Sequence, residues 1–346
     1  MTANERVAKL KKGLIPRDEA IKKFKVYDGC KEELIGGGVR VKFSLSEKDE
    51  DSVLVEHKKE EFTLGKETYT KLCRLVGIPS TYVDKTPSEL FFPHLTYWLG
   101  EGGMTVKTLQ KPVLDKDGRK KIVGFMREDS GYFPVNQILK VADKFGDNYL
   151  IENADGVSWR TSAFGIVFPK HEFEIKETAQ RGDFIYGGIK IKYSILGEHP
   201  FRISVFLLTL VCMNGMVSAN EIYVFNKRRA VGGENEFVEG SLQTGIGVLQ
   251  QEVSRVQQLT SIPVTDEHII PYVESLFDNA GVNQKSREEV LKQIVEKRPK
   301  NLYQLMNAAT SAAHSVENRG DVYGLQSLGG YIVSHAASCP SCHRPL

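Results

Sequence analysis

The sequence predicts an α+β fold: a central, mainly antiparallel, curved sheet with a helical N-terminal lead-in and a helical C-terminal layer. The strongest indication is residues 201–216, an almost uninterrupted apolar run that stops at Asn214 and Gly215. Such a run, rich in β-branched and aromatic residues and followed by a turn dipeptide, is typical of the buried centre of a domain. Strand patterns surround it over residues 104–264, and helical patterns occupy residues 265–335.

Residues 1–103 form the predicted N-terminal α+β lead-in. Apolar and polar side chains alternate over residues 39–45, which is the period of a half-buried strand, and residues 53–57 are its predicted hairpin partner. Apolar side chains at helical spacing predict a helix over 68–76 that ends at Gly77, and a second short helix over 88–98.

Residues 104–264 form the predicted β-rich core domain. Two strands, over 104–109 and 121–126, flank a turn at 115–118, and a helix over 134–145 begins at Pro134. Further strands are expected over 149–151, 158–168, 184–195, 203–213 and 222–226, and a helix over 244–259. Periodicity alone leaves open whether residues 203–213 are a strand or a buried helix.

Residues 265–335 form the predicted C-terminal helical region, with helices over 266–279, 286–296, 301–316 and 322–335. Thr265 and Ser286 stand where N-caps belong. The last residues, 336–346, form a tail with cysteine and histidine side chains.

Composition favours a soluble protein. The chain has 346 residues, of which 41% are hydrophobic and 26% charged, and no apolar run reaches the length of a membrane span. Five cysteines and a polar, Lys-rich N-terminus without a secretory segment predict reduced thiols in a cytoplasm. Because the net charge is only +2, any site for a polyanion must be a local basic patch.

Two local clusters of basic residues are candidate nucleic-acid contacts. The first surrounds the predicted hairpin, and the second follows a predicted strand and precedes a Gly-Gly pair. The candidates are Lys107, Lys116, Arg119, Lys120, Lys121, Arg127, Lys227, Arg228 and Arg229, with Lys111 also beside the hairpin. Aromatic residues interleave with them at Phe125, Tyr132, Phe133, Tyr223 and Phe225. Rings that stack on unpaired bases, with cations on phosphates, are how single-strand binders work. The alternative is that the cations are solvated hairpin tips and the rings belong to the core.

The tail carries the strongest local constellation for a metal. Cys339 and Cys342 are spaced as a zinc knuckle, and His343 or His335 would add a nitrogen ligand. No second Cys-x2-Cys completes a four-ligand set, so a fourth ligand would come from elsewhere, such as another subunit. The same residues also match the Cys-x2-Cys-His motif of covalent haem attachment, a modification that occurs in export compartments. The third interpretation is an ordinary tail with two thiols.

Familiar enzyme motifs are absent from the sequence. It has no phosphate-binding loop, no His-Glu-x2-His and no Gly-x-Ser-x-Gly. Four carboxylates are candidates for a Mg²⁺-dependent nuclease: Asp143, Asp147, Glu152 and Asp155. Their spacing is equally that of a charged surface, so an enzyme is the minority interpretation.

Three separated blocks carry a family resemblance. They are LVGIPSTY at 75–82 with PSEL at 87–90 and LTYWL at 95–99, LVCMNGM at 210–216, and LYQLMNAAT at 302–310. In order and spacing they resemble the phage/plasmid-like proteins with domain of unknown function 932 (DUF932), over about residues 64–331. The resemblance implies a setting in phage and plasmid genomes, often among replication and recombination genes, and no established reaction.

The functional hypothesis combines the basic clusters with this resemblance. It is a phage- or plasmid-encoded accessory protein in the cytoplasm of a bacterial host, which binds single-stranded DNA and anneals strands in recombination or replication. We expect a homo-oligomer along the strand, no membrane contact and no required cofactor, with zinc at the tail as the one candidate. The alternative is a protein–protein interaction factor, a virion component or host-defence inhibitor, with an apolar patch through Leu302, Leu305 and Met306.

Overall fold

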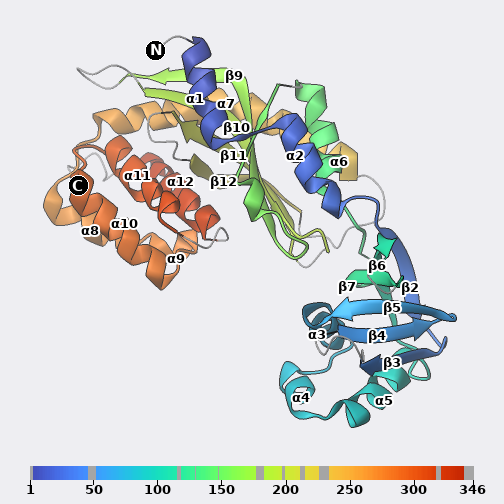
Figure 1. Cartoon of the computed structure of the whole chain (residues 1–346). Helices are drawn as coiled ribbons and strands as arrows, with labels where there is room; N and C mark the ends of the chain where they lie inside the picture. Colours follow the sequence, from blue (N-terminus) through green and yellow to red (C-terminus); the bar gives the residue numbers. More distant parts are fainter. Residues whose placement is uncertain are drawn as a thin grey trace.

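The computed structural model describes residues 3–45, 52–114, 118–128, 130–146, 148–176, 183–196, 199–210, 215–225, 234–316 and 321–338. The α+β fold is confirmed, with two six-stranded sheets in place of the single central sheet that we expected. Figure 1 shows the two sheets in separate bodies. We call the described part of 31–126 the small lobe, and the described residues of 3–27 and 130–338 the large lobe.

The small lobe is built on the sheet β2-β6-β7-β5-β4-β3. Its strands are β2 (Lys31–Gly36), β3 (Val41–Leu45), β4 (Ser52–His57), β5 (Glu60–Gly65), β6 (Thr105–Leu114) and β7 (Lys120–Met126). All neighbours are antiparallel except β5 and β7. Three helices follow β5, namely α3 (Lys66–Leu75), α4 (Ser80–Lys85) and α5 (Ser88–Leu99), and α3 and α5 bury apolar side chains against one face of the sheet.

This sheet moves the domain boundary that we predicted between residues 103 and 104. Strands β6 and β7 lie beyond that boundary, yet β6 pairs with β2 and β7 with β5. A cut at 103 would separate the core around Phe62, Val106 and Phe125 from two of the six strands of its sheet. Both predicted hairpins, 39–45 with 53–57 and 104–109 with 121–126, are confirmed.

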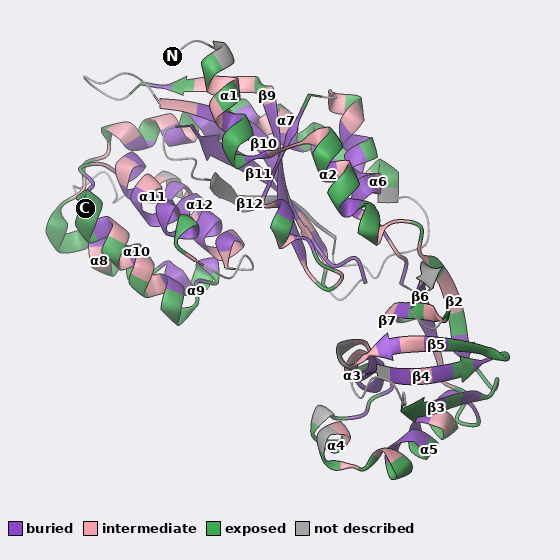
Figure 2. Ribbon diagram, in the orientation of Figure 1, coloured by how far each residue is buried: buried purple, intermediate pink, exposed green. Residues whose placement is uncertain are grey.

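The large lobe is built on the sheet β1-β8-β9-β10-β11-β12, antiparallel throughout. Its strands are β1 (Ile15–Pro16), β8 (Leu150–Glu152), β9 (Ser162–Ile175), β10 (Asp183–Tyr193), β11 (Phe201–Thr209) and β12 (Gly215–Phe225). Most of the apolar run at 201–216 therefore forms a strand, β11, which lies between two long neighbours. Figure 2 shows that β10 and β11 are buried over most of their length and β9 over its first half, and the burial of β11 is what the run predicts.

Helices cover both faces of this sheet. On one face α6 (Val135–Ala142) and α7 (Glu234–Gln258) pack against Ile189, Ile191 and Ile203. On the other, α1 (Ala3–Gly13) places Leu10 and Leu14 against apolar side chains of β8 to β11. Helix α7 begins ten residues earlier than predicted, because Val238 and Leu242 are buried in the core although Gly240 interrupts the helical pattern.

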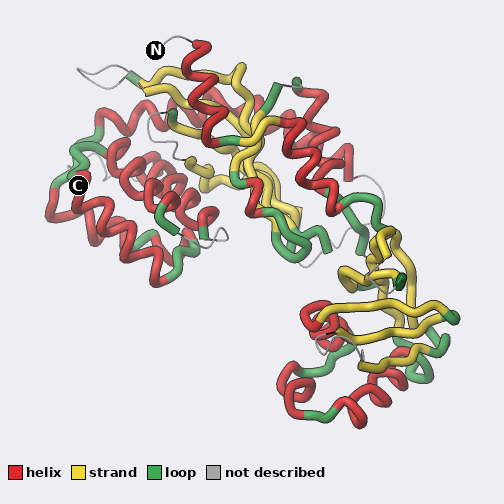
Figure 3. Tube along the Cα trace, viewed as in Figure 1, coloured by secondary structure: helices red, strands yellow, loops and turns green. Residues whose placement is uncertain are grey.

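The C-terminal layer is helical, as predicted. It contains α8 (Asp266–Glu274), α9 (Phe277–Ala280), α10 (Gln284–Lys297), α11 (Leu302–Ser311) and α12 (Val322–Ser338), which gather in Figure 3. The N-cap of α10 is Asn283, whose side chain accepts a hydrogen bond from the Ser286 N–H, so Ser286 is not the cap. No helix of the described chain is long and apolar enough to cross a membrane.

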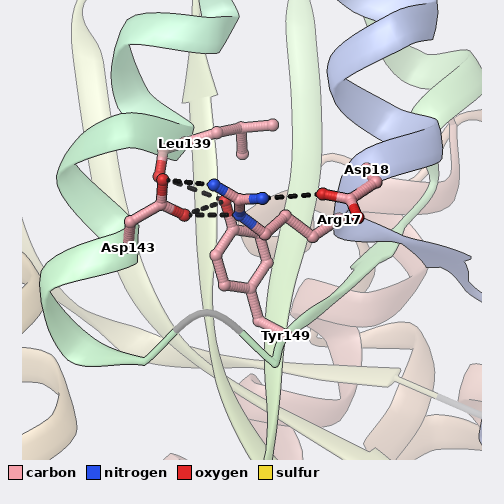
Figure 4. A network of polar contacts seen from close by, with 5 residues as sticks. All are labelled: Arg17, Asp18, Leu139, Asp143 and Tyr149. Carbon is pink, nitrogen blue, oxygen red and sulfur yellow. Dashed lines mark hydrogen bonds and ion pairs between the residues drawn. The ribbon is translucent and has the colours of Figure 1, made fainter.

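Ion pairs join the N-terminal helices to the rest of the large lobe. Arg17 opens α2 (Arg17–Phe24), and its guanidinium donates two hydrogen bonds of 2.7 Å to the carboxylate of Asp143 beyond α6. The Tyr149 hydroxyl lies 3.0 Å from the same carboxylate and 3.1 Å from the Leu139 carbonyl, while Asp18 binds the other edge of Arg17 (Figure 4). Arg6 of α1 binds Glu172 of β9 in a similar way.

Candidate nucleic-acid interface

The β6–β7 hairpin carries the first basic cluster on the face turned away from the small-lobe core. Lys111 and Lys121 are register partners, so their side chains leave the hairpin on the same side. Lys111 is half-buried and Lys121 is exposed. Within the described residues neither makes an ion pair, so both ammonium groups are available to an anion.

The large lobe contacts this outer face beside the two lysines. Leu196 fills the space over Gly124, where an added Cβ would lie 2.2 Å from the leucine side chain. Trp159 packs there with Tyr27, with ring centroids 4.9 Å apart, and the Tyr132 hydroxyl donates to the Tyr27 carbonyl. The junction between the lobes is thus an aromatic cluster seated on the basic hairpin.

Trp159 brings an aromatic ring to the basic cluster. It is half-buried, and the Lys111 ammonium lies 5.8 Å from its ring centroid. A lysine beside a partly exposed indole is the combination that stacks on a base and binds its phosphate. Sequence reasoning missed Trp159, because it follows β8 by several residues and only the fold brings it to the hairpin.

Lys107 is not an open nucleic-acid contact. Its side chain points to the outer face, but the chain after β7 covers it and leaves the residue 8% exposed. Its ammonium donates to the Ser130 carbonyl at 2.5 Å and lies 3.3 Å from the Glu32 carboxylate. This lysine holds the hairpin against the connection between the lobes, so we no longer count it among the candidate nucleic-acid contacts.

Arg119 and Lys120 are placed in ion pairs with β5. Arg119 lies 3.0 Å from Glu61, and Lys120 lies 2.8 Å from Glu60. Exposed pairs of this kind contribute at most about 1 kcal/mol, so a phosphate can compete for these cations. Arg127, directly after β7, is exposed and pairs with no carboxylate of the described chain.

The aromatic residues predicted to stack on bases are mostly in the core. Phe125 is 0% exposed and Phe133 is 2% exposed, so neither ring reaches solvent. Tyr132 is half-buried in the junction. The side chains of Tyr223 and Phe225 lie outside the described part of the structure.

Several predicted site residues also fall outside the described residues. They are Lys116, Lys227, Arg228, Arg229, Cys339, Cys342 and His343. Of the zinc candidates only His335 is described, and its ring lies against Tyr272 with centroids 5.3 Å apart. The described residues contain no group of three or more His, Cys, Asp or Glu side chains arranged to hold a metal.

The described carboxylates of the nuclease interpretation each bind a different cation. Asp143 is paired with Arg17, which lowers the pKa of that carboxyl, and Asp155 is paired with Lys23 at 2.5 Å. Glu152 is paired with Lys190. Asp147 lies outside the described residues. The three carboxylates therefore have separate structural partners and do not form one site.

Glu152 and Lys190 belong to a buried polar cluster that the sequence did not reveal. The Lys190 ammonium, with a side chain 0% exposed, donates to Glu152 at 2.5 Å, and Gln326 of α12 donates to the other oxygen at 2.7 Å. The pair reaches across Gly165 of the intervening strand, where a Cβ would stand 3.2 Å from the carboxylate. Burial lowers the pKa of Lys190, and Glu152 opposes that change.

Two further polar atoms border this cluster. One is the hydroxyl of Ser204, the register partner of Lys190 on β11, and the other is the side-chain oxygen of Gln326. Both atoms are buried and have no hydrogen-bond partner in the described chain. One turn earlier on α12, the Tyr323 ring lies 4.3 Å from the Lys192 ammonium. These contacts join α12 to β8 and to β10.

The apolar patch expected for an interaction factor is not at the predicted helix. Leu302 and Leu305 are 0% exposed and Met306 is 2% exposed, because α11 packs inside the C-terminal layer.

Comparison of the chain with protein-family models, curated proteins and solved structures found no match in any of the three.

Proposed function

We propose that this protein binds single-stranded DNA along the outer face of the β6–β7 hairpin, as an accessory protein of phage or plasmid DNA metabolism that anneals strands. The observation that carries the proposal is the juxtaposition of Lys111 and Lys121 with the Trp159 ring. We define these three residues with Arg127 as the hairpin interface.

The cations and the aromatic ring of the hairpin interface have different roles. Lys111, Lys121 and Arg127 neutralise phosphates, and each contact releases counterions, so the affinity falls as salt rises. Trp159 stacks on a base, which is worth about 1–3 kcal/mol and depends little on sequence. Arg119 and Lys120 join by exchanging their glutamate partners for phosphate. Duplex DNA offers no unstacked base to Trp159, so single strands are preferred.

The test is fluorescence anisotropy with labelled single-stranded and duplex oligonucleotides over a salt series, using the full chain. Lys121→Ala and Arg127→Ala should each weaken single-strand binding and reduce the slope of log affinity against log salt by about 0.7 per phosphate contact. Trp159→Leu should weaken binding about 5- to 150-fold with the slope unchanged.

The matched control is Lys140→Ala, which removes an exposed lysine from α6 of the large lobe. Its affinity and slope should equal those of the unchanged protein. A salt-independent affinity, or equal losses in Lys121→Ala and Lys140→Ala, would remove the hairpin interface from the proposal. Annealing is then measured separately, as the rate at which two complementary labelled strands pair.

A further inference from the structure

Helix α5 presents an uncharged apolar face to solvent. Its buried side packs Phe91, Leu95 and Leu99 into the small-lobe core. The opposite side exposes Leu90 at 62%, Tyr97 at 53% and Trp98 at 46%, with Pro93 and His94 between them. No Asp, Glu, Lys or Arg occurs between Glu89 and Glu101. Most helices that cover a core turn charged residues to water, so this face departs from the usual pattern.

A neighbouring helix enlarges the face. Tyr82 of α4 is 39% exposed, and its ring stacks on His94 with centroids 6.3 Å apart and planes 10° from parallel. The Tyr82 hydroxyl is 2.9 Å from the His94 Nδ1. Together these side chains expose on the order of 400 Å² of largely apolar surface, the size of patch that marks an interaction site on a monomer.

We propose that this face, which we call the α5 face, binds a second copy of the same chain in an antiparallel, two-fold arrangement. A two-fold axis between Pro93 and His94 would place Leu90 of one copy opposite Tyr97 of the other, so that the apolar positions cover one another. Lys85 ends α4 just before α5, Glu101 follows α5, and both are exposed. An antiparallel pairing therefore brings the basic end of one copy towards the acidic end of the other.

The charges distinguish a second copy from a nucleic acid. A polyanion would meet a stretch from residue 86 to residue 100 that has no Lys or Arg and contains Glu89, with Glu101 directly after it. A copy of the chain meets an uncharged surface and an oppositely charged end. The α5 face and the hairpin interface are different surfaces, so this proposal stands or falls independently of the proposed function.

The experiment is sedimentation equilibrium of the full chain over a concentration series. The unchanged protein should dimerise, and Tyr97→Glu should raise the dissociation constant at least about tenfold, as the loss of a central anchor does. Leu90→Glu should do the same and covers the case in which Tyr97→Glu does not fold. Val295→Glu is the control, because Val295 is 60% exposed on α10 and lies outside the α5 face.

A charge exchange tests the antiparallel arrangement. Lys85→Glu and Glu101→Lys should each weaken the dimer, and the two together in one chain should restore it, because each end regains an opposite pair. A monomer at every concentration overturns the proposal. So does a dimer that Tyr97→Glu leaves intact, or a Tyr97→Glu variant that loses oligonucleotide affinity without any change in assembly.

Discussion

Replacing Lys190 by methionine isolates the energetic effect of the buried ion pair. Methionine is unbranched and similar in length, so it fills the same space and leaves little cavity. What remains is the Glu152 carboxylate, 11% exposed and held only by the Gln326 amide among the described residues. At the 2.5 Å that separates the Lys190 ammonium from the carboxylate oxygen, opposite charges attract by about 7 kcal/mol at an effective dielectric constant of about 20. The cost of removing both groups from water offsets part of this attraction.

The expected loss is therefore about 3–5 kcal/mol of unfolding free energy, the range found when one partner of a buried pair is removed. A domain of ordinary stability has about 5–15 kcal/mol, so the variant should unfold at a much lower urea concentration. Glu152→Gln combined with Lys190→Met leaves no buried charge and keeps an amide beside Gln326. The double variant should lose less than Lys190→Met alone.

The assay is equilibrium urea denaturation followed by far-UV circular dichroism on the unchanged protein, both single variants and the double variant. A loss of less than about 1 kcal/mol in Lys190→Met would contradict a buried ion pair, since that is the contribution of a solvated pair. Single losses that add in the double variant would equally contradict it, because additivity means that the side chains do not interact.

Three further predictions concern single side chains of the two lobes. Arg17 lowers the pKa of the Asp143 carboxyl below its value in the unfolded chain. The pair therefore stabilises the fold fully above about pH 4–5, and this contribution is lost as the pH falls through the folded pKa. Asp143→Asn should reduce the loss of unfolding free energy at acid pH, as urea denaturation over a pH series would show. Gly124→Ala should destabilise by about 1–3 kcal/mol, because the methyl displaces Leu196, and adding Leu196→Ala should recover part of that loss; a loss that stays the same in the double variant contradicts this. Burial raises the pKa of the Cys73 thiol to about 12, so Cys73 should resist alkylation at pH 8 until urea unfolds the small lobe, as peptide mass spectrometry of the labelled chain would show.

Local patterns were enough to predict most elements but not their pairing. The apolar run became β11, and the C-terminal helices lie close to their predicted positions, since each depends on side chains near in sequence. The domain boundary was wrong because β6 and β7 join a sheet begun by β2, and strand patterns do not state their partners.

The site residues show the same limit. Lys190 and Lys192 alternate with isoleucine, and this alternation predicts a strand without stating what the lysines contact. Lys190 is buried against Glu152, and Gln326 of α12, 174 residues from Glu152, binds the other oxygen of that carboxylate. The position of Trp159 also depends on the fold, because the junction around Leu196 and Gly124 places its ring beside the hairpin.

The small lobe interrupts the large lobe in the chain, and this fixes an order of events on the ribosome. Residues 31–126 contain both edges of their own sheet, so the small lobe can close as soon as that continuous stretch has emerged. Helix α1 precedes the small lobe in the chain, yet Leu10 and Leu14 pack in one cluster with Val167, Tyr186 and Phe206, which are made much later. The apolar side of α1 therefore stays uncovered until translation has passed β11.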